Sequence, residues 1–202
     1  MALKRPKPDD LDYAGGIGCT TITSDCPHRQ VASQHATDHD DERDLRGATM
    51  TDDPFALARF VTAQDGRDPH HRGIDWRSIT AELAAGRKRG HWMWFVFPQV
   101  DLGHTPTSHH FAIMSRDEAA AYLAHPILGP RLRECTSLIL EGGDSDPVAI
   151  FGHADSRKLH SSLTLFDAVD SGGIFAEGLD TFFAGEHDEI TLTFLRSFRE
   201  AD

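Results

Sequence analysis

The sequence predicts an all-α protein: a single compact domain of about seven helices, preceded by a disordered N-terminal tail. After Pro54, apolar residues recur at helical spacing in most stretches, as they do in helices that bury one face. Helix-start signals precede several of these stretches. The alternation of strands and helices that is typical of α/β proteins is absent from the sequence, and no repeat of about 20–50 residues indicates a solenoid.

The first 49 residues differ in composition from the rest of the chain. They are polar, and neither helical nor strand periodicity is sustained in them. Such a segment cannot bury enough apolar surface to offset the conformational entropy lost on ordering. Residues 1–49 are therefore expected to be a disordered extension or the product of a mis-assigned start site. The helical domain is expected to span residues 50–202.

In the first half of this domain, each expected helix has its own start signal. Asp53 is an N-cap residue, and Pro54 follows it at the first helical position, which predicts a helix from Pro54 onward. Asp75 is the N-cap of the next expected helix. Ser115 and Glu118 have the spacing of a capping box before an alanine-rich stretch.

The second half of the domain continues the helical pattern. A helix is expected from Gly129, another over residues 156–168, and a third after Gly173. Asp146 starts a short turn before the second of these. Residues 190–198 alternate partly like a strand, but the length of the stretch and the way it ends favour a helix.

Charge and composition exclude several classes of function. The chain has 20 Lys and Arg against 32 Asp and Glu, a net charge of −12, which argues against binding nucleic acid or an anionic membrane surface. No apolar run approaches the roughly 18–20 residues of a membrane helix, and no secretory signal is recognisable. Three cysteines cannot form a disulfide scaffold. We therefore expect an acidic, soluble, cytoplasmic monomer that binds neither nucleic acid nor membranes.

The most aromatic segment spans residues 91–99. Two tryptophans and two phenylalanines stand within six positions, and each such ring buries on the order of 150–250 Å². We expect Trp94 and the two phenylalanines to lie in the core. The polar residues His91 and Gln99 bracket this run: they need partners if they are buried, and they are natural ligand contacts if they line a cleft.

Two further segments carry polar side chains beside apolar ones. His125 and Arg131 flank a tight turn and could face an anionic group near the start of the next helix; the alternative is ordinary loop chemistry with a solvated arginine. Lys158, Ser161 and Thr164 share one helical face, which either is solvated or lines a pocket. A nucleophilic Ser161 would need a nearby lysine or histidine as base.

No common catalytic motif is present. The sequence lacks the G-x-S-x-G, H-E-x-x-H, P-loop and G-x-G-x-x-G patterns that would indicate a hydrolase, a zinc site or a nucleotide fold. We expect no metal site and no cofactor, and whether the protein is an enzyme stays open. Cys135 lies on an apolar helical stripe and is expected to be a small core residue.

Four blocks of the sequence resemble the bacterial family catalogued as domain of unknown function 1810, over roughly residues 52–198. Some members carry the label "calpastatin". The resemblance implies a compact, mainly helical fold and no established activity. The loop over residues 65–75 looks longer than is usual in the family, and His160 stands where members often have arginine. The blocks are Asp53-Pro-Phe-x-Leu-x-Arg59-Phe60, Ala85-Gly-Arg-Lys88 followed by His91-Trp-Met-Trp-Phe-x-Phe-Pro-Gln99, Tyr122-Leu-x-His-Pro-x-Leu-Gly-Pro-Arg131-Leu and Lys158-Leu-x-Ser161-Ser162-x-Thr164-Leu-Phe166.

Two functions are compatible with the sequence. The first is a small-molecule pocket, enzymatic or ligand-binding, with a nucleotide or an ADP-ribose-like compound as the suggested ligand. The alternative is a non-catalytic protein-interaction module that uses an aromatic patch. For the first, we expect four of the polar residues to converge in one cleft: His91, Gln99, Lys158 and Ser161. The expected catalytic residues are His91, Lys158 and Ser161, and the expected ligand-binding residues are Trp92, Gln99, His125, Arg131 and Thr164.

Overall fold

The fold is described from a computed structural model of the chain. It describes residues 53–71, 74–101 and 105–199, all of which belong to the second of two units in the chain, Met50–Asp202. The expected N-terminal extension, residues 1–49, lies outside the described residues.

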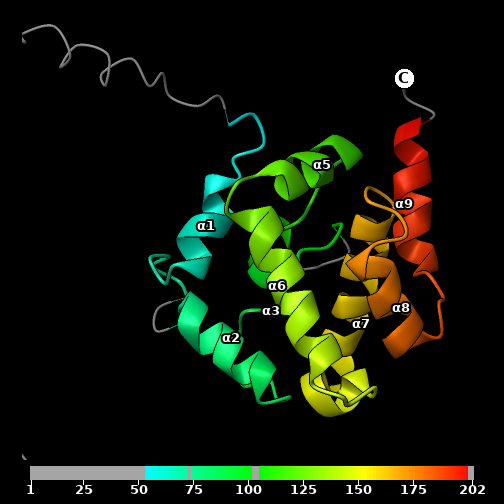
Figure 1. The fold of residues 1–202 in the computed structure, drawn as a ribbon. Coiled ribbons are helices and arrows are strands. Elements are labelled where there is room, and N and C mark those ends of the chain that lie inside the picture. Colours follow the sequence, from blue (N-terminus) through cyan, green and yellow to red (C-terminus); the bar gives the residue numbers. More distant parts are fainter. Residues whose placement is uncertain (1–52, 72–73, 102–104, 200–202) are drawn as a thin grey trace, which may run out of the picture. The chain divides into compact units, whose positions relative to one another are not determined.

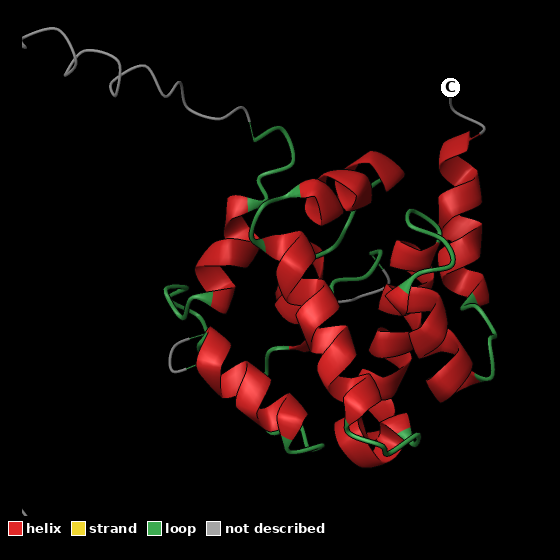
Figure 2. Ribbon diagram, in the orientation of Figure 1, coloured by secondary structure: helices red, strands yellow, loops and turns green. Residues whose placement is uncertain are grey.

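Within the described residues the all-α prediction is confirmed. They contain nine helices and no strand (Figure 2), with an isolated parallel bridge between Val100 and Ile113. None of these helices is long and apolar enough to cross a bilayer. The helices are α1 (Ala58–Gln64), α2 (Trp76–Ala84), α3 (Met93–Val96), α4 (Pro106–His110), α5 (Arg116–Ala124), α6 (Leu128–Glu141), α7 (Pro147–Asp167), α8 (Ile174–Phe183) and α9 (Glu189–Arg199).

The helix count exceeds the expected seven because two helices are very short. Helix α3 has four residues and lies within the aromatic segment, and α4 has five residues. Neither is long enough to show a helical period in the sequence. Residues 190–198 belong to α9, so the preference for a helix over a strand is confirmed there.

Helix α1 begins later than the sequence predicts. It starts at Ala58 rather than Pro54, because Ala56 adopts a left-handed backbone conformation with φ 51°. Asp53 still serves the helix start: its carboxylate accepts hydrogen bonds from the backbone N–H groups of Leu57 (2.7 Å) and Ala58 (3.0 Å). The capping residue was therefore identified correctly, but an irregular turn separates it from the helix.

The expected capping box at α5 forms only in part. The Ser115 hydroxyl accepts from the Glu118 backbone N–H at 3.0 Å, as predicted. The Glu118 carboxylate instead accepts from the Met114 backbone N–H and pairs with Arg59 at 2.6 Å. Arg59 also donates to the carbonyl oxygen of Ala112. This nearly buried ion pair thus joins α1 to the start of α5.

Helix α6 occupies the middle of the helical arrangement. It packs against α2, α5 and α8, while α7 packs against α8 and α9 (Figure 1). Gly129 allows the close turn between α5 and α6, because a Cβ atom there would lie 2.0 Å from the carbonyl oxygen of Leu123. Cys135 of α6 is buried, as expected, and burial raises the pKa of its thiol.

Helix α7 joins two elements that the sequence indicates separately. The turn at Asp146 and the helix over residues 156–168 form one long element with a kink at Gly152. Gly152 has φ 76° and ψ 164°, a combination that is almost restricted to glycine. Beyond the kink, α7 presents one polar face toward the residues that follow α3.

Candidate functional site

A cavity of about 410 Å³ lies between α7, the start of α9 and the segment 94–99. We call it the Lys158 pocket. It brings together Gln99, Lys158 and Ser161, three of the four residues expected to converge in one cleft. Its polar and aromatic lining residues are Trp94, Gln99, Arg157, Lys158, His160, Ser161 and Asp188.

Lys158 is held in place by a carboxylate that it shares with a second lysine. Its Nζ atom lies 2.7 Å from Asp155 Oδ1, and Lys88 Nζ lies 2.6 Å from Asp155 Oδ2. Burial alone would raise the pKa of Asp155, but hydrogen bonds and charge attraction from Lys158 and Lys88 outweigh it, so this pKa is lowered. Two ammonium groups therefore share one carboxylate, and of the two only Lys158 lines the cavity.

The aromatic wall of the pocket is Trp94. Lys158 Nζ lies 3.7 Å from the centroid of the Trp94 ring, within the range of a cation–π interaction. The prediction that Trp94 lies fully in the core is therefore wrong: its side chain is only partly buried, whereas Phe95 and Phe97 are completely buried. The side chain that covers the Trp94 ring is the charged Lys158. A prediction from the number of apolar residues in the segment does not take such a cover into account.

A chain of hydrogen bonds forms the opposite part of the pocket. Ser161 Oγ lies 2.6 Å from Thr191 Oγ1, and Thr191 donates to the Asp188 carboxylate through both its hydroxyl (2.5 Å) and its backbone N–H (2.9 Å). Asp188 thereby caps the first turn of α9. Thr164 Oγ1 accepts from the Asp188 backbone N–H at 2.9 Å, so Thr164 positions Asp188 instead of lining the cavity.

Gln99 is the most unusual polar residue of the pocket. It is only 8% exposed, and its backbone carbonyl oxygen accepts from the Ile113 N–H. Its side-chain amide has no hydrogen-bond partner among the described residues. The described side-chain atoms that are both buried and without a partner belong to Asp101 and Ser162. The Gln99 amide is not among them, so it is open to the cavity and available to a hydrogen-bonding ligand.

The other two expected site residues of the aromatic segment lie outside the pocket. His91 is exposed and does not line the cavity. Trp92 is fully buried; its Nε1–H donates to Glu82 Oε2 at 2.8 Å, and its ring packs edge-on against Phe151. Trp92 thus lies in the core next to the pocket.

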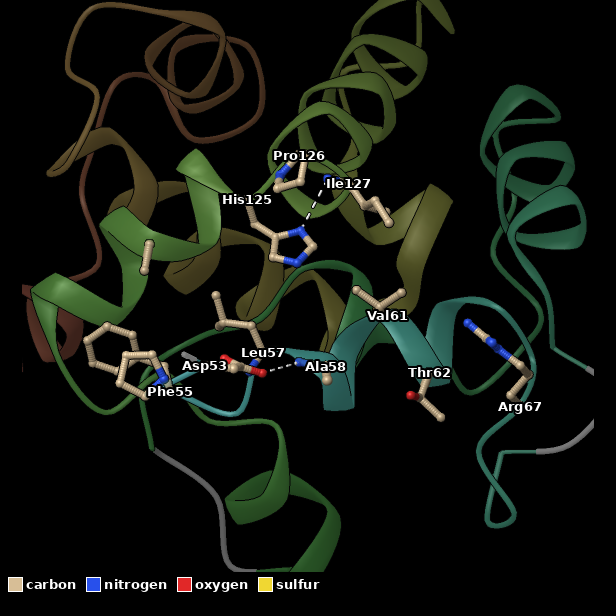
Figure 3. A pocket seen from close by; sticks show the side chains of 12 residues that line it. Asp53, Phe55, Leu57, Ala58, Val61, Thr62, Arg67, His125, Pro126 and Ile127 are labelled. Atoms are coloured by element: carbon tan, nitrogen blue, oxygen red, sulfur yellow. Dashed lines mark hydrogen bonds between the residues drawn. The ribbon is translucent and has the colours of Figure 1, made fainter. Parts of the chain in front are cut away.

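His125 lines a different, larger cavity of about 530 Å³ between α1 and the α5–α6 turn (Figure 3). Its Nδ1 atom accepts from the backbone N–H groups of Ile127 (3.1 Å) and Leu128 (3.3 Å), so the ring carries its proton on Nε2. Two of the other three polar lining residues have partners: Asp53 caps α1, and Arg67 pairs with Asp65. The third is Thr62. This cavity is mostly apolar and carries no cluster of free polar groups.

Arg131 lies apart from both cavities. It pairs with Asp65 at 2.8 Å, donates to Gln64 at 3.2 Å and stacks on Trp76. His125 and Arg131, although close in sequence, therefore do not face a common group.

Sequence reasoning did not single out Lys88, Asp155, Arg157 or Asp188 as residues that shape the pocket. Two of them left a signal in the sequence. Asp155 stands three positions before Lys158 on one helix, a spacing that permits an ion pair. Asp188 stands three positions before Thr191, which is the spacing of an N-cap and its third helical residue. The pairing of Lys88 with Asp155 joins residues 67 positions apart and leaves no local pattern.

The residues of the pocket do not form a metal centre. In the part of the chain that the structure describes, no three His, Cys, Asp or Glu side chains are placed to hold a metal ion. The pocket instead combines ammonium and guanidinium groups, one carboxylate, a hydroxyl and an amide beside an indole ring. Such a mixture of apolar wall and few polar groups is typical of sites for small organic molecules.

Over the residues that the structure describes, the fold and this cavity define a helical domain with a small, mixed polar and aromatic pocket. The chain belongs to the family described as "Protein of unknown function (DUF1810)", whose model matches residues 54–195. It is similar to the conserved hypothetical protein Rv1873 from Mycobacterium tuberculosis, known from a crystal structure at 1.38 Å, with 46% sequence identity and a TM-score of 0.65. The similarity covers 71% of this chain and 99% of that chain. No curated protein matches, and neither match carries the label "calpastatin".

Proposed function

We propose that the protein binds a small anionic molecule in the Lys158 pocket, as a cytoplasmic monomer that binds neither nucleic acid nor membranes. The observation that carries this proposal is the Gln99 side chain, which is nine-tenths buried at the cavity and has no hydrogen-bond partner among the described residues. The amide makes no hydrogen bond within the described part of the fold and lines the cavity, so both its donor and its acceptor are available to a ligand. A ligand that pairs with it accounts for its position.

The charge of the pocket supports an anionic ligand. The shared carboxylate of Asp155 offsets only one of the two lysines it contacts, and Arg157 lies beside Lys158 at the cavity. Asp188 is the acidic residue among the lining side chains. The lining thus holds two cationic side chains, Arg157 and Lys158, against one carboxylate, although the chain as a whole has a net charge of −12.

A nucleotide or an ADP-ribose-like compound is the ligand class we favour. The cavity volume of about 410 Å³ falls in the range of roughly 300–1,000 Å³ that is usual for small-molecule sites. The Trp94 ring and the Ile190 side chain supply an apolar wall for the less polar part of such a molecule.

Ligand binding, without a chemical step, is the part of this function that the contacts support. Ser161 is hydrogen-bonded to Thr191, and Lys158 is hydrogen-bonded to Asp155. Among the described residues, Ser161 has no hydrogen bond to a lysine or histidine that would act as its base. Catalytic roles for His91, Lys158 and Ser161 stay predictions.

A thermal-shift screen with nucleotides, sugar phosphates and inorganic phosphate tests the proposal. A compound at about 100 times its Kd stabilises the folded state by about 2.7 kcal/mol, which raises the melting temperature by roughly 5–10 °C for a domain of this size. Lys158→Met keeps the aliphatic stem on Trp94 and removes the charge, so it should abolish the shift. Arg77→Gln, an exposed residue of α2 outside the pocket, is the matched control and should retain it.

Two results would overturn the proposal: no shift with any of these compounds, or an equal shift in the Lys158→Met protein. Either would favour the alternative, a protein-interaction module with an aromatic patch. Among the described residues, the large hydrophobic side chains that are exposed are Met114, Ile127 and Ile190. None is aromatic, which supports the small-molecule function over this alternative.

A further inference from the structure

The donor and the acceptor of each hydrogen bond that links Ser161, Thr191 and Asp188 can be assigned, because each hydroxyl group has one proton to donate. The Asp188 carboxylate only accepts, so Thr191 must donate its single hydroxyl proton to it. Thr191 Oγ1 can then only accept from Ser161, 2.6 Å away. Ser161 therefore donates its single hydroxyl proton to Thr191 Oγ1. Toward the cavity, the Ser161 oxygen is therefore a hydrogen-bond acceptor and not a donor.

Asp188 extends this acceptor surface. Its Oδ2 atom receives the two hydrogen bonds from Thr191, and within the described residues its Oδ1 atom has no partner. The Asp188 side chain is partly buried and lines the cavity. Ser161, which lines the cavity but is only 1% exposed, and the more accessible Asp188 carboxylate offer a ligand acceptor atoms and no donor.

Hydrogen-bond donors line the same cavity one turn earlier on α7. Arg157 and Lys158 precede Ser161 by about one turn of α7, a rise of roughly 5 Å along the helix axis. Both side chains carry donors only. The His160 ring also lines the cavity, but its Nε2–H donates to the Glu186 carbonyl oxygen at 2.7 Å and its ring stacks on Phe183.

A ligand that satisfies both surfaces needs an anionic group and, roughly 5 Å away, hydroxyl or amine protons. We infer that the ligand of the Lys158 pocket is a phosphorylated sugar, free or as part of a nucleotide. Its phosphate faces Arg157 and Lys158, and its sugar hydroxyls donate to Ser161 and Asp188. The Gln99 amide, which both donates and accepts, completes the contacts. This inference rests on the proposed anion-binding function and adds the requirement for hydroxyl donors.

Calorimetric titration of the full chain with three phosphates tests the inference. Ribose 5-phosphate has phosphate and hydroxyls, butyl phosphate has the phosphate alone, and adenosine monophosphate adds a base. Ribose 5-phosphate should bind at least about tenfold more tightly than butyl phosphate, since each hydrogen bond to a charged group is worth roughly that factor. Tighter binding of adenosine monophosphate would identify the nucleotide as the source, and equal binding of the two sugar compounds would identify the free sugar phosphate.

Asp188→Asn separates the sugar contact from the helix cap. Asparagine caps helices as well as aspartate does, but its amide places a donor where the carboxylate offers an acceptor. The variant should bind ribose 5-phosphate no better than butyl phosphate. Asp146→Asn is the matched control: Asp146 caps α7 by accepting from the Val148 backbone N–H, lies outside the pocket, and should leave the preference unchanged.

The possible failures are distinguishable. Equal affinity of the unaltered protein for ribose 5-phosphate and butyl phosphate would overturn the inference and leave the anion-binding function standing. Retention of the preference in the Asp188→Asn protein would also overturn it. Binding of none of the three phosphates would refute the inference and the proposed function together.

Discussion

Asp155 holds Lys158 without cancelling its charge. The carboxylate is divided between Lys158 and Lys88, and Lys88 also donates to the Gly90 carbonyl oxygen. The side chain of Lys88 is only 7% exposed, so its position is fixed by the core. Lys88 is thus a positioning residue: it anchors Asp155, which sets where Lys158 lies over the Trp94 ring.

Gln99→Leu is expected to preserve or increase stability and to weaken ligand binding. The substitution removes an amide that makes no hydrogen bond among the described residues, so no partner is left unpaired, and it adds apolar surface at a residue that is only 8% exposed. Urea denaturation and calorimetric titration of the same sample measure the two effects. If Gln99 serves ligand binding and not folding, its replacement leaves stability unchanged or raises it while ligand affinity falls.

Gln64→Leu is the matched control for that prediction. Gln64 is 1% exposed, but its amide donates to the Phe95 carbonyl oxygen (2.7 Å) and to the Tyr122 hydroxyl (3.2 Å). Its loss leaves buried groups unpaired and should cost about 1–3 kcal/mol. If Gln99→Leu destabilises the protein as much as Gln64→Leu, then Gln99 serves the fold and the argument for a ligand site fails.

At the scale of single elements, local sequence signals located helix starts better than helix lengths. Asp75 accepts from the Ser78 backbone N–H at 2.8 Å, as its position before α2 predicts. The sequence around Asp53 is equally favourable, yet α1 starts five residues later. The left-handed Ala56 that causes this delay has no signature in the sequence, because alanine does not favour that backbone conformation. Arg59 donates to the carbonyl oxygens of Phe55 and Ala56 beside it.

The kink in α7 leads to a prediction for Gly152→Ala. The backbone of Gly152 lies in a region nearly closed to other residues, so alanine should cost about 1–3 kcal/mol. A Cβ atom there would meet nothing within 4 Å, which means that the cost is conformational and not steric. Chemical denaturation measures it.

Gly142→Ala provides the comparison. Gly142 ends α6 with φ −64° and ψ −15°, angles that alanine adopts freely, and its Cβ would make contacts of ordinary length. This variant should be neutral or more stable, because alanine restricts the unfolded chain. Equal stability of the two variants would show that Gly152 does not require its left-handed backbone.

At the scale of the whole molecule, the sequence predicted the class of fold but not the composition of the pocket. Helical periodicity is local, so the all-α architecture could be read from it. The pocket depends on which segments meet in space: Lys88 lies in the loop after α2 and Asp155 lies on α7. His91, beside the same aromatic segment, is exposed. Polarity next to an apolar run identified Gln99, Lys158 and Ser161 as candidates, but it could not separate them from His91.

A protein shortened to begin at Met50 is expected to fold as the full chain does. The family match begins at residue 54, and 71% of the chain covers 99% of the similar crystallised protein. Far-ultraviolet circular dichroism should keep its helical form, and the melting temperature should change by less than about 2 °C. A fall of several degrees would show that residues 1–49 contribute to the stability of the helical domain.

The buried thiol of α6 gives that shortened protein a useful chemical property. Cys135 is its single cysteine, and burial raises the pKa of this thiol, so that the reactive thiolate is scarce while the helix stays in place. Alkylation by iodoacetamide then requires α6 to separate from its neighbours. The rate of labelling therefore reports how often the centre of the domain opens, and any ligand that binds the folded state should slow it.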